Sequence, residues 1–231
     1  MRFVFTPPQQ AALPVKDSSD LFPIHRIYCV GRNYVEHAKE MGSDGRELPF
    51  FFMKPADAAL VVPFGTTGEM PYPTQTGNLH HEIELVACIS KGGKNIPAAH
   101  AYEHIFGFAV GLDMTRRDLQ AALKDKGRPW DVAKGFDFSA PISPVVPLAQ
   151  SGRQEQGAIW LNVNGVKRQA SDVSKLIWSI GETIEHLSGL FELQPGDLIF
   201  TGTPEGVAAV KTGDLMQGGI EGIGELAVKL K

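Results

Sequence analysis

Residues 82–90 constrain the fold most, because this strand-like segment is apolar on both faces except where it begins. Side chains two apart in a strand share a face. One face is apolar throughout, while the other begins with Glu82 and Glu84 and continues with Val86 and Cys88. A strand that is apolar on both faces is buried between layers. The two carboxylates are therefore expected to lie close together in a position that is shielded from bulk water.

Short strand-like runs separated by glycine and proline dominate the rest of the chain, at residues 26–30, 48–53, 105–112, 198–201 and 225–231. Asn164-Gly165 joins the alternating segment 159–163 to Val166 and predicts a β-hairpin. The 25 glycines and 16 prolines imply many turns. Because regular alternation of strands and helices is missing, we expect an α+β fold with a mixed, mostly antiparallel sheet core and a few short helices.

Helix signals are few. Asn33 is a candidate cap for a short helix over residues 34–41. Thr115 and Asp118 form a capping-box pattern that predicts a helix reaching Gly127, and its apolar face would carry Leu119, Ala122 and Leu123. A longer helix is expected from apolar residues at helical spacing between 176 and 187, with Ser174 as its cap and Gly189 after its end.

Composition excludes several classes of protein. The 231 residues are 43% hydrophobic and 21% charged, which argues against disorder and allows one large core. The net charge of −4 offers no basic excess for nucleic acid, so we expect no nucleic-acid partner. No apolar run approaches the roughly 18 residues that span a bilayer, and Pro7 and Pro8 break the apolar start, so no signal peptide is expected.

Two cysteines, Cys29 and Cys88, lie in apolar stretches. One buried disulfide is an alternative, but two reduced core thiols in a cytoplasmic protein are the expected arrangement. Residues 1–24 are expected to form an N-terminal arm, loose and proline-containing over 6–23. Residues 25–231 would form a single catalytic domain.

Glu82 and Glu84 suggest a metal site. Paired carboxylates in a buried setting must share a proton or hold a cation, and such hard oxygen ligands suit Mg²⁺, Mn²⁺ or Ca²⁺ rather than zinc. Asp113, which ends an apolar run before a predicted helix, is the best third ligand. The alternative is that the Glu82–Glu84 pair arises by chance and that Asp113 lies in an ordinary turn, since 26 acids in 231 positions yield about three pairs at this spacing.

Other side chains offer acid–base or anion-binding chemistry. His37 and Glu40 share a face of the short helix, where a carboxylate would orient an imidazole base, although a solvated surface pair is the commoner outcome. Lys134 lies among apolar residues, where it would stabilise an enolate or simply extend to solvent. The glycine-rich segment 201–207 would present backbone N–H groups near Gly202 and the Thr203 hydroxyl to a carboxylate, or form a plain turn.

Several known motifs are missing. The chain contains no G-x-S-x-G, C-x-x-C or H-E-x-x-H pattern, and residues 201–207 lack the Gly-Lys-Ser/Thr ending of a phosphate-binding loop. The sequence therefore gives no support to a serine esterase, a thiol redox protein, a zinc protease or a phosphate-binding-loop enzyme.

Taken together, these segments resemble the fumarylacetoacetate hydrolase family. The matching stretches are YCVGRNY with His37 and Glu40, PFFFMKPADA, HEIEL, GLDMT with Asp118 and Gln120, KGFD and GDLIFTGTPEGV, in the family's order over roughly residues 25–230. The resemblance implies a β-sandwich or β-roll core of the family's C-terminal-domain type and usually a homodimer. It also implies a Mg²⁺ or Mn²⁺ site at Glu82, Glu84 and Asp113.

The resemblance further implies roles for individual residues. His37 and Glu40 match the pair that activates water from a mobile lid, and Lys134, Gln120 and Thr203 match substrate-contacting positions. Compact bacterial members of the family cleave 2,4-diketo acids (acylpyruvates), and others decarboxylate oxaloacetate or isomerise related acids. The chain length and the FVFTPP opening are most similar to members that hydrolyse fumarylpyruvate to fumarate and pyruvate in the gentisate pathway of aromatic catabolism.

Two questions stay open from sequence. A fumaryl group ends in a carboxylate and would need a cation, for which Arg32, Arg116, Arg117 and Lys54 are unranked candidates. The activity expected is hydrolysis of a carbon–carbon bond. Oxaloacetate decarboxylation on the same site is the nearest alternative, and a non-catalytic dicarboxylate binder or a metal-free structural domain is a more distant one.

Overall fold

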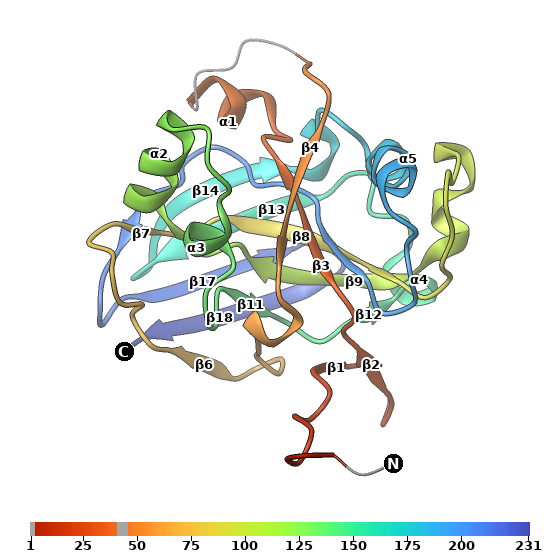
Figure 1. Cartoon of the computed structure of the whole chain (residues 1–231), viewed down its shortest axis with the longest axis horizontal. Coiled ribbons are helices and arrows are strands. Elements are labelled where there is room, and N and C mark those ends of the chain that lie inside the picture. Colours follow the sequence, from red (N-terminus) through yellow and green to blue (C-terminus); the bar gives the residue numbers. More distant parts are fainter. Residues whose placement is uncertain (1–2, 41–45) are drawn as a thin grey trace.

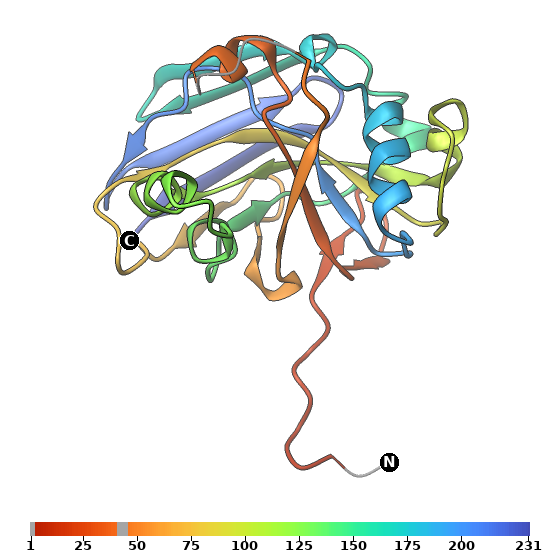
Figure 2. The same ribbon diagram turned by 45° about the horizontal axis from the view of Figure 1, so that its top comes forward.

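Two β-sheets packed face to face form the body of the protein (Figures 1 and 2). The computed structural model describes residues 3–40 and 46–231, without the side chains of residues 38–40. The larger sheet has the order β4 (Phe50–Lys54), β3 (Ile27–Gly31), β15 (Leu198–Phe200), β8 (Ile83–Ile89), β9 (Ile105–Leu112), β11 (Ala140–Ile142) and β5 (Ala59–Val61), with β12 (Val146–Pro147) also paired to β9.

The smaller main sheet has the order β14 (Val166–Asp172), β13 (Ala158–Val163), β17 (Leu215–Ile220), β18 (Gly224–Leu230) and β6 (Thr67–Met70). Strand pairs β3–β15, β5–β11 and β6–β18 are parallel and the other pairs within these two sheets are antiparallel. Two minor sheets are formed by β1 (Ala12–Pro14) with β2 (Leu21–Pro23), and by β10 (Thr115–Arg116), β7 (Leu79–His80) and β16 (Ala209–Val210). The expected α+β class with a mixed, mostly antiparallel core is confirmed.

The helices are short and lie around the sheets: α1 (Val35–Glu40), α2 (Arg117–Asp125), α3 (Asp131–Lys134), α4 (Leu148–Ser151), α5 (Ile180–Leu190) and the 3₁₀ turns η1 (Ala56–Ala58), η2 (Ala98–His104) and η3 (Val173–Lys175). In Figure 1, α1, α2 and α3 gather on one side of the molecule and α5 lies on the other. Within the described part of the chain, no helix combines the length and apolarity that crossing a bilayer requires.

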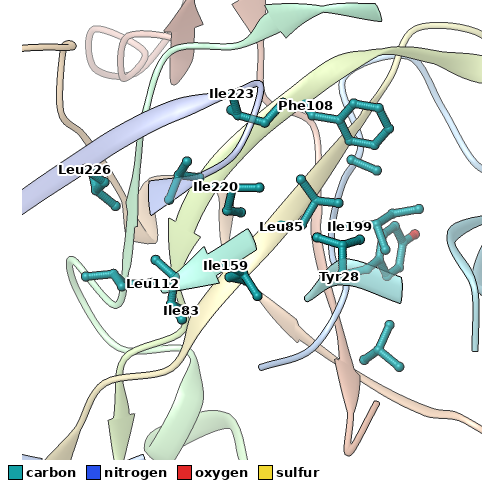
Figure 3. Close-up of a cluster of buried hydrophobic side chains, with 14 of the residues drawn as sticks. Tyr28, Ile83, Leu85, Phe108, Leu112, Ile159, Ile199, Ile220, Ile223 and Leu226 are labelled. Carbon is teal, nitrogen blue, oxygen red and sulfur yellow. The ribbon is translucent and has the colours of Figure 1, made fainter. Parts of the chain in front are cut away.

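The two faces of β8 enter two different cores. Ile83, Leu85, Ala87 and Ile89 pack between the main sheets, where Figure 3 shows Ile83 and Leu85 facing Ile159 of β13 and Ile220 of β17. Val86 and Cys88 join the second core on the opposite face of the larger sheet. The alternation predicted from sequence is therefore confirmed, and Glu84 lies on the face of the second core.

The N-terminal segment differs from the loose arm expected over residues 6–23. Strands β1 and β2 form an antiparallel hairpin, and Leu13, Val15, Phe22 and Ile24 are buried in the second core. Residues 3–10 are exposed and extend away from the sheets in Figure 2. Cys29 and Cys88 are free and buried, so the disulfide alternative is wrong and the prediction of reduced core thiols is confirmed.

The predicted start of the longest helix is wrong. Ser174 lies in η3, and α5 begins only at Ile180, where Ser179 and Glu182 form a capping box. The intervening residues 176–179 are not helical: Leu176 forms a β-bridge with Tyr34, and the Ile177 amide donates to the Asn33 carbonyl. Gly189 lies inside the helix rather than after it.

The capping box predicted at Thr115 is also wrong. Thr115 belongs to β10, and the residue that precedes α2 is Arg116, which makes no capping side-chain bond. The expected apolar face is not buried either: Ala122 is exposed, and the buried residue of α2 is Gln120. Asp118 instead accepts hydrogen bonds from Thr76 and from the Gly77 amide, which ties α2 to the preceding loop.

Candidate active site

Three acidic side chains meet where β8 begins and β9 ends. Because the two strands are antiparallel, Ile83 lies opposite Leu112, and the Asp113 amide donates to the Glu82 carbonyl at 2.8 Å. Glu82, Glu84 and Asp113 are all buried, and each offers an oxygen within 4.8 Å of the others'. The structure thus brings together the three residues predicted from the sequence.

Three cations surround these acids. Lys134, the last residue of α3, places its Nζ 2.7 Å from Glu82 Oε2 and 2.6 Å from Asp113 Oδ2. Lys54, at the end of β4, lies 2.8 Å from Asp113 Oδ1, and Arg117 of α2 pairs with Glu82. All three are donated by segments far from β8 in the sequence.

The ionisation of the acids follows from these neighbours. Burial opposes the charge of Glu82, but Lys134 and Arg117 hold its pKa well below the ordinary value. Burial, with Asp113 and Glu82 beside it, raises the pKa of Glu84 well above the ordinary value. Asp113 and Glu82 likewise raise the pKa of Lys134 against the effect of its burial. Glu84 is therefore the carboxylate whose negative charge is least compensated.

The donor set fits a divalent cation. Asp113 Oδ1 is buried and accepts no hydrogen bond from the described residues, although Lys54 Nζ lies 2.8 Å away and donates to the carbonyls of Met114 and Lys134. An unfilled lone pair on a buried carboxylate, next to the uncompensated Glu84, is an environment that a hard cation stabilises. Lys134 pairs with the remaining oxygen of Asp113.

A pocket opens onto the acids. It is lined by Val30, Gly31, Arg32, His37, Phe50, Phe52, Glu82, Glu84, Asp113, Arg117, Gln120, Trp130, Lys134 and Thr203. His37 of α1 is only 5% exposed, and it is near enough to contribute to the lowered pKa of Glu82. The side chain of Glu40, the predicted partner of His37, lies outside the described part of the structure.

The segment after β15 reaches the acids through its backbone. The Gly202 amide donates to Glu84 Oε2 at 2.7 Å, so it holds one of the three acids, and its expected contact with substrate stays a prediction. Gly202 has φ +104°, and a Cβ there would lie 2.6 Å from that of Asn33. The Thr203 hydroxyl donates to the Ile83 carbonyl, so Thr203 fastens the segment to β8 while also lining the pocket.

Gln169 of β14 is a residue that sequence reasoning missed. Its side-chain oxygen accepts from the Ile83 amide and bonds His81 Nδ1, while its nitrogen donates to Thr203 Oγ1 and the Pro204 carbonyl. One amide of the smaller sheet therefore fixes both the start of β8 and the segment after β15. The alternating hairpin pattern carried no signal of this role.

Asn33 has a comparable linking role. Its side chain donates to the carbonyls of Thr201 and Trp178 and accepts from the Trp178 amide. The residue that was expected to cap α1 thus joins the segment before α1 to the end of β15 and to the chain before α5.

Comparisons with known proteins agree with this geometry. The model of the fumarylacetoacetate (FAA) hydrolase C-terminal family matches residues 26–231. A fumarylpyruvate hydrolase of Ralstonia sp is 49% identical over 79% of this chain and 92% of its own. A mitochondrial oxaloacetate tautomerase of Mus musculus is 42% identical over 89% of this chain and 91% of its own.

A solved structure is closely similar. The crystal structure of fumarylpyruvate hydrolase from Pseudomonas aeruginosa in complex with Mn²⁺ and pyruvate is 56% identical, covers 99% of both chains and superposes with a TM-score of 0.98. The expected fold type is thereby confirmed. With the family model matching most of its length and these relatives matching its sequence and structure, the chain belongs to the fumarylacetoacetate hydrolase family.

Proposed function

We propose that this chain is a metal-dependent hydrolase that cleaves the carbon–carbon bond of an acylpyruvate, with fumarylpyruvate giving fumarate and pyruvate as the expected reaction. The observation that carries the proposal is the buried group of Glu82, Glu84 and Asp113, which shares one pocket with His37 and Lys134. The similarity to an enzyme crystallised with Mn²⁺ and pyruvate supports it.

The charge of the site suits a dianionic substrate. Three carboxylates face the three cations Lys54, Arg117 and Lys134, so the side chains roughly balance. Glu82, Glu84 and Asp113 would hold Mg²⁺ or Mn²⁺, with Ca²⁺ a possible substitute in crystals. A bound divalent ion supplies a Lewis acid for the oxygens of the 2-oxo acid and offsets the charge of the pyruvate enolate.

The chain's own residues would perform the proton transfers. His37, oriented by Glu40, takes a proton from the water that attacks the C4 carbonyl of the substrate. The electron pair of the C3–C4 bond then passes to C3, where the positive charge of Lys134 stabilises the enolate. Return of the proton from His37 to C3 completes pyruvate, and the attacked carbon leaves as a carboxylic acid.

The remaining predicted residues would position the substrate. Gln120 and Arg32 both line the pocket, and the side-chain oxygen of Gln120 accepts a hydrogen bond from Arg117. Thr203 would contact substrate from the segment after β15, and Gly202 would act by holding Glu84.

A substrate panel tests the proposal. The chain is stripped of metal, reloaded with Mg²⁺ or Mn²⁺, and assayed for pyruvate release from fumarylpyruvate, acetylpyruvate and oxaloacetate. We expect hydrolysis of the two diketo acids and its loss without metal. Preference for oxaloacetate would favour the alternative, decarboxylation or tautomerisation on the same site, which the similarity to oxaloacetate tautomerases also suggests.

A variant separates hydrolysis from that alternative. His37→Ala should abolish diketo-acid hydrolysis while metal binding persists, because His37 serves the attacking water and not the ion. His100→Ala, at an exposed histidine of η2, is the matched control. Normal hydrolysis by His37→Ala would refute the role of His37 as the base. If the wild type bound metal but turned over none of the substrates, the chain would be a non-catalytic dicarboxylate binder.

We also propose the wider setting. Residues 25–231 would form the catalytic domain of a cytoplasmic enzyme of the gentisate pathway. A homodimer is supported by the exposed apolar side chains of Phe50 and Met53 on β4, which is one of the two edge strands of the larger sheet. Light scattering on the purified protein measures the assembly directly.

A further inference from the structure

The four cations that the sequence offered for a distal substrate carboxylate differ in what they already bind. Arg117 pairs with Glu82 and donates to Gln120 and His80. Lys54 is 1% exposed, and its ammonium lies against Asp113 and the carbonyls of Met114 and Lys134. Arg117 therefore lines the pocket with its donors already bonded, and Lys54 lies against Asp113 outside the pocket lining.

Arg116 lies outside the lining of the pocket. Its Nη1 donates to the Val132 carbonyl at 3.0 Å, and its guanidinium carbon lies 4.4 Å from the centre of the Phe136 ring. Although Arg116 Nε has no hydrogen-bond partner among the described residues, this side chain does not face a substrate in that cavity.

Arg32 has donors to spare and lines the pocket. Its ionic partner is Glu47, 3.8 Å away and 66% exposed, which makes a weak and solvated pair. Arg32 Nε is buried and bonds none of the described residues. The backbone at Arg32 is left-handed, with φ +56°, a strained conformation that is concentrated at functional sites.

Flat aromatic side chains lie next to Arg32. Phe50, Phe52 and Trp130 line the same pocket. The Arg32 guanidinium lies 5.5 Å from the centre of the Phe50 ring, and Phe50 meets Trp130 edge-on at 5.4 Å. The pocket is thus lined by acids, by cations that are paired with those acids, and by aromatic side chains next to Arg32, whose Nε bonds none of the described residues.

We propose that Arg32 and these aromatic side chains form an acyl subsite that selects a planar acyl chain ending in a carboxylate. The proposal rests on the proposed function and deepens it. The aromatic rings contact the flat unsaturated chain, and the guanidinium binds the distal carboxylate through two parallel hydrogen bonds. An acyl group without that carboxylate gains nothing from Arg32.

The subsite is tested by the ratio of kcat/KM for fumarylpyruvate to kcat/KM for acetylpyruvate. In the wild type, kcat/KM for fumarylpyruvate should exceed that for acetylpyruvate, and Arg32→Gln should lower this ratio by roughly 10- to 100-fold. Arg32→Lys, which keeps the charge without the planar fork, should lower it less. Arg116→Gln is the control and should keep the wild-type ratio. An unchanged ratio in Arg32→Gln would overturn the proposal.

A binding experiment decides the same point without catalysis. Calorimetry with metal-loaded protein compares fumarate with crotonate, which has the same planar shape but a methyl group in place of one carboxylate. The wild type should prefer fumarate, and Arg32→Gln should lose this preference. Equal affinities in the wild type would refute the subsite, whereas failure to cleave either diketo acid would refute the proposed function alone.

Discussion

Glu84 is the acid of the proposed metal site whose charge is least compensated by the protein. Glu82 and Asp113 each have a cation at ion-pair distance, but Glu84 receives the Gly202 amide and faces two like charges. A buried carboxylate in that position destabilises the metal-free fold when it is ionised. Glu84 therefore lowers the free energy of unfolding of the metal-free protein, and a bound cation would remove this loss.

Replacing Glu84 by glutamine should therefore separate stability from binding. We expect Glu84→Gln to weaken Mn²⁺ binding roughly 100-fold or more, because a charged ligand becomes a neutral one. Without metal, the variant should unfold at the same temperature as the wild type or a higher one, because glutamine is neutral without having to take up a proton. Titration calorimetry and thermal unfolding measure the two effects.

Glu192→Gln, at an exposed position, is the matched control and should change neither quantity. Wild-type metal affinity in Glu84→Gln would remove this residue from the site.

At this scale the three acids and Lys134 were singled out from the sequence, whereas the pairing of Lys54 and Arg117 with those acids was not. The alternation of residues 82–89 placed Glu82 and Glu84 on one face, and the end of an apolar run marked Asp113. Lys54 and Arg117 reach the acids only through the tertiary fold, Lys54 from β4 at an edge of the larger sheet and Arg117 from the start of α2. Nothing in the local pattern around either residue specifies that contact.

Among the elements, the segment after β15 links the backbone to the metal site. Gly202 and Gly213 both have a left-handed backbone, with φ +104° and +93°. A Cβ at Gly213 meets nothing within 4 Å, whereas at Gly202 it meets Asn33 at 2.6 Å. The two glycines thus share a conformational constraint and differ in their surroundings.

Gly202→Ala and Gly213→Ala form a matched pair. Each should lose about 1–3 kcal/mol of unfolding free energy from backbone strain. Only Gly202→Ala should also weaken Mn²⁺ binding, by roughly 10- to 100-fold, because the shifted amide no longer holds Glu84. Chemical denaturation and metal titration measure both. Equal metal affinities in the two variants would refute the role assigned to the Gly202 amide.

The start of α5 provides a test of capping. Ser179 accepts from the Glu182 amide, and Glu182 accepts from Ser179, so Ser179→Ala should cost about 1 kcal/mol of unfolding free energy. Ser174→Ala, at the position that the sequence pattern favoured, should change it by less than about 0.5 kcal/mol. The reverse order in denaturant unfolding would contradict the observed helix boundary.

Elements were predictable where their pattern is local. The strand 105–112 was predicted with its bounds and the hairpin turn at Asn164-Gly165 in its place, because turn chemistry and runs of apolar residues are sequence-local. The boundary of α5 was not, because residues 176–178 are drawn into contacts with Asn33 and Tyr34, about 140 residues earlier. Short strands such as β7 and β16 have two residues each and are defined by their pairing with a neighbouring strand, so they show no alternation of apolar and polar residues.

For the whole molecule, the site lies where three distant parts of the fold converge. The larger sheet supplies the acids, the α2–α3 region supplies Arg117 and Lys134, and Gln169 of the smaller sheet bonds to the start of β8 and to the segment after β15. Metal binding at this junction couples to global stability, because the unfolded chain does not bring these ligands together.

This coupling should depend on pH in a defined direction. Since burial and the neighbouring acids raise the pKa of Glu84, the metal-free protein keeps a proton that the unfolded chain has released. Its free energy of unfolding therefore falls as pH rises from the ordinary pKa of a glutamate, which holds in the unfolded chain, to the raised pKa of Glu84 in the folded protein. A bound cation replaces the proton and removes this loss, so the rise in melting temperature caused by Mg²⁺ should be larger at about pH 8 than at about pH 6. Metal-free Glu84→Gln should lack the fall, and an equal Mg²⁺ effect at both pH values would show that Glu84 gives up no proton when the ion binds.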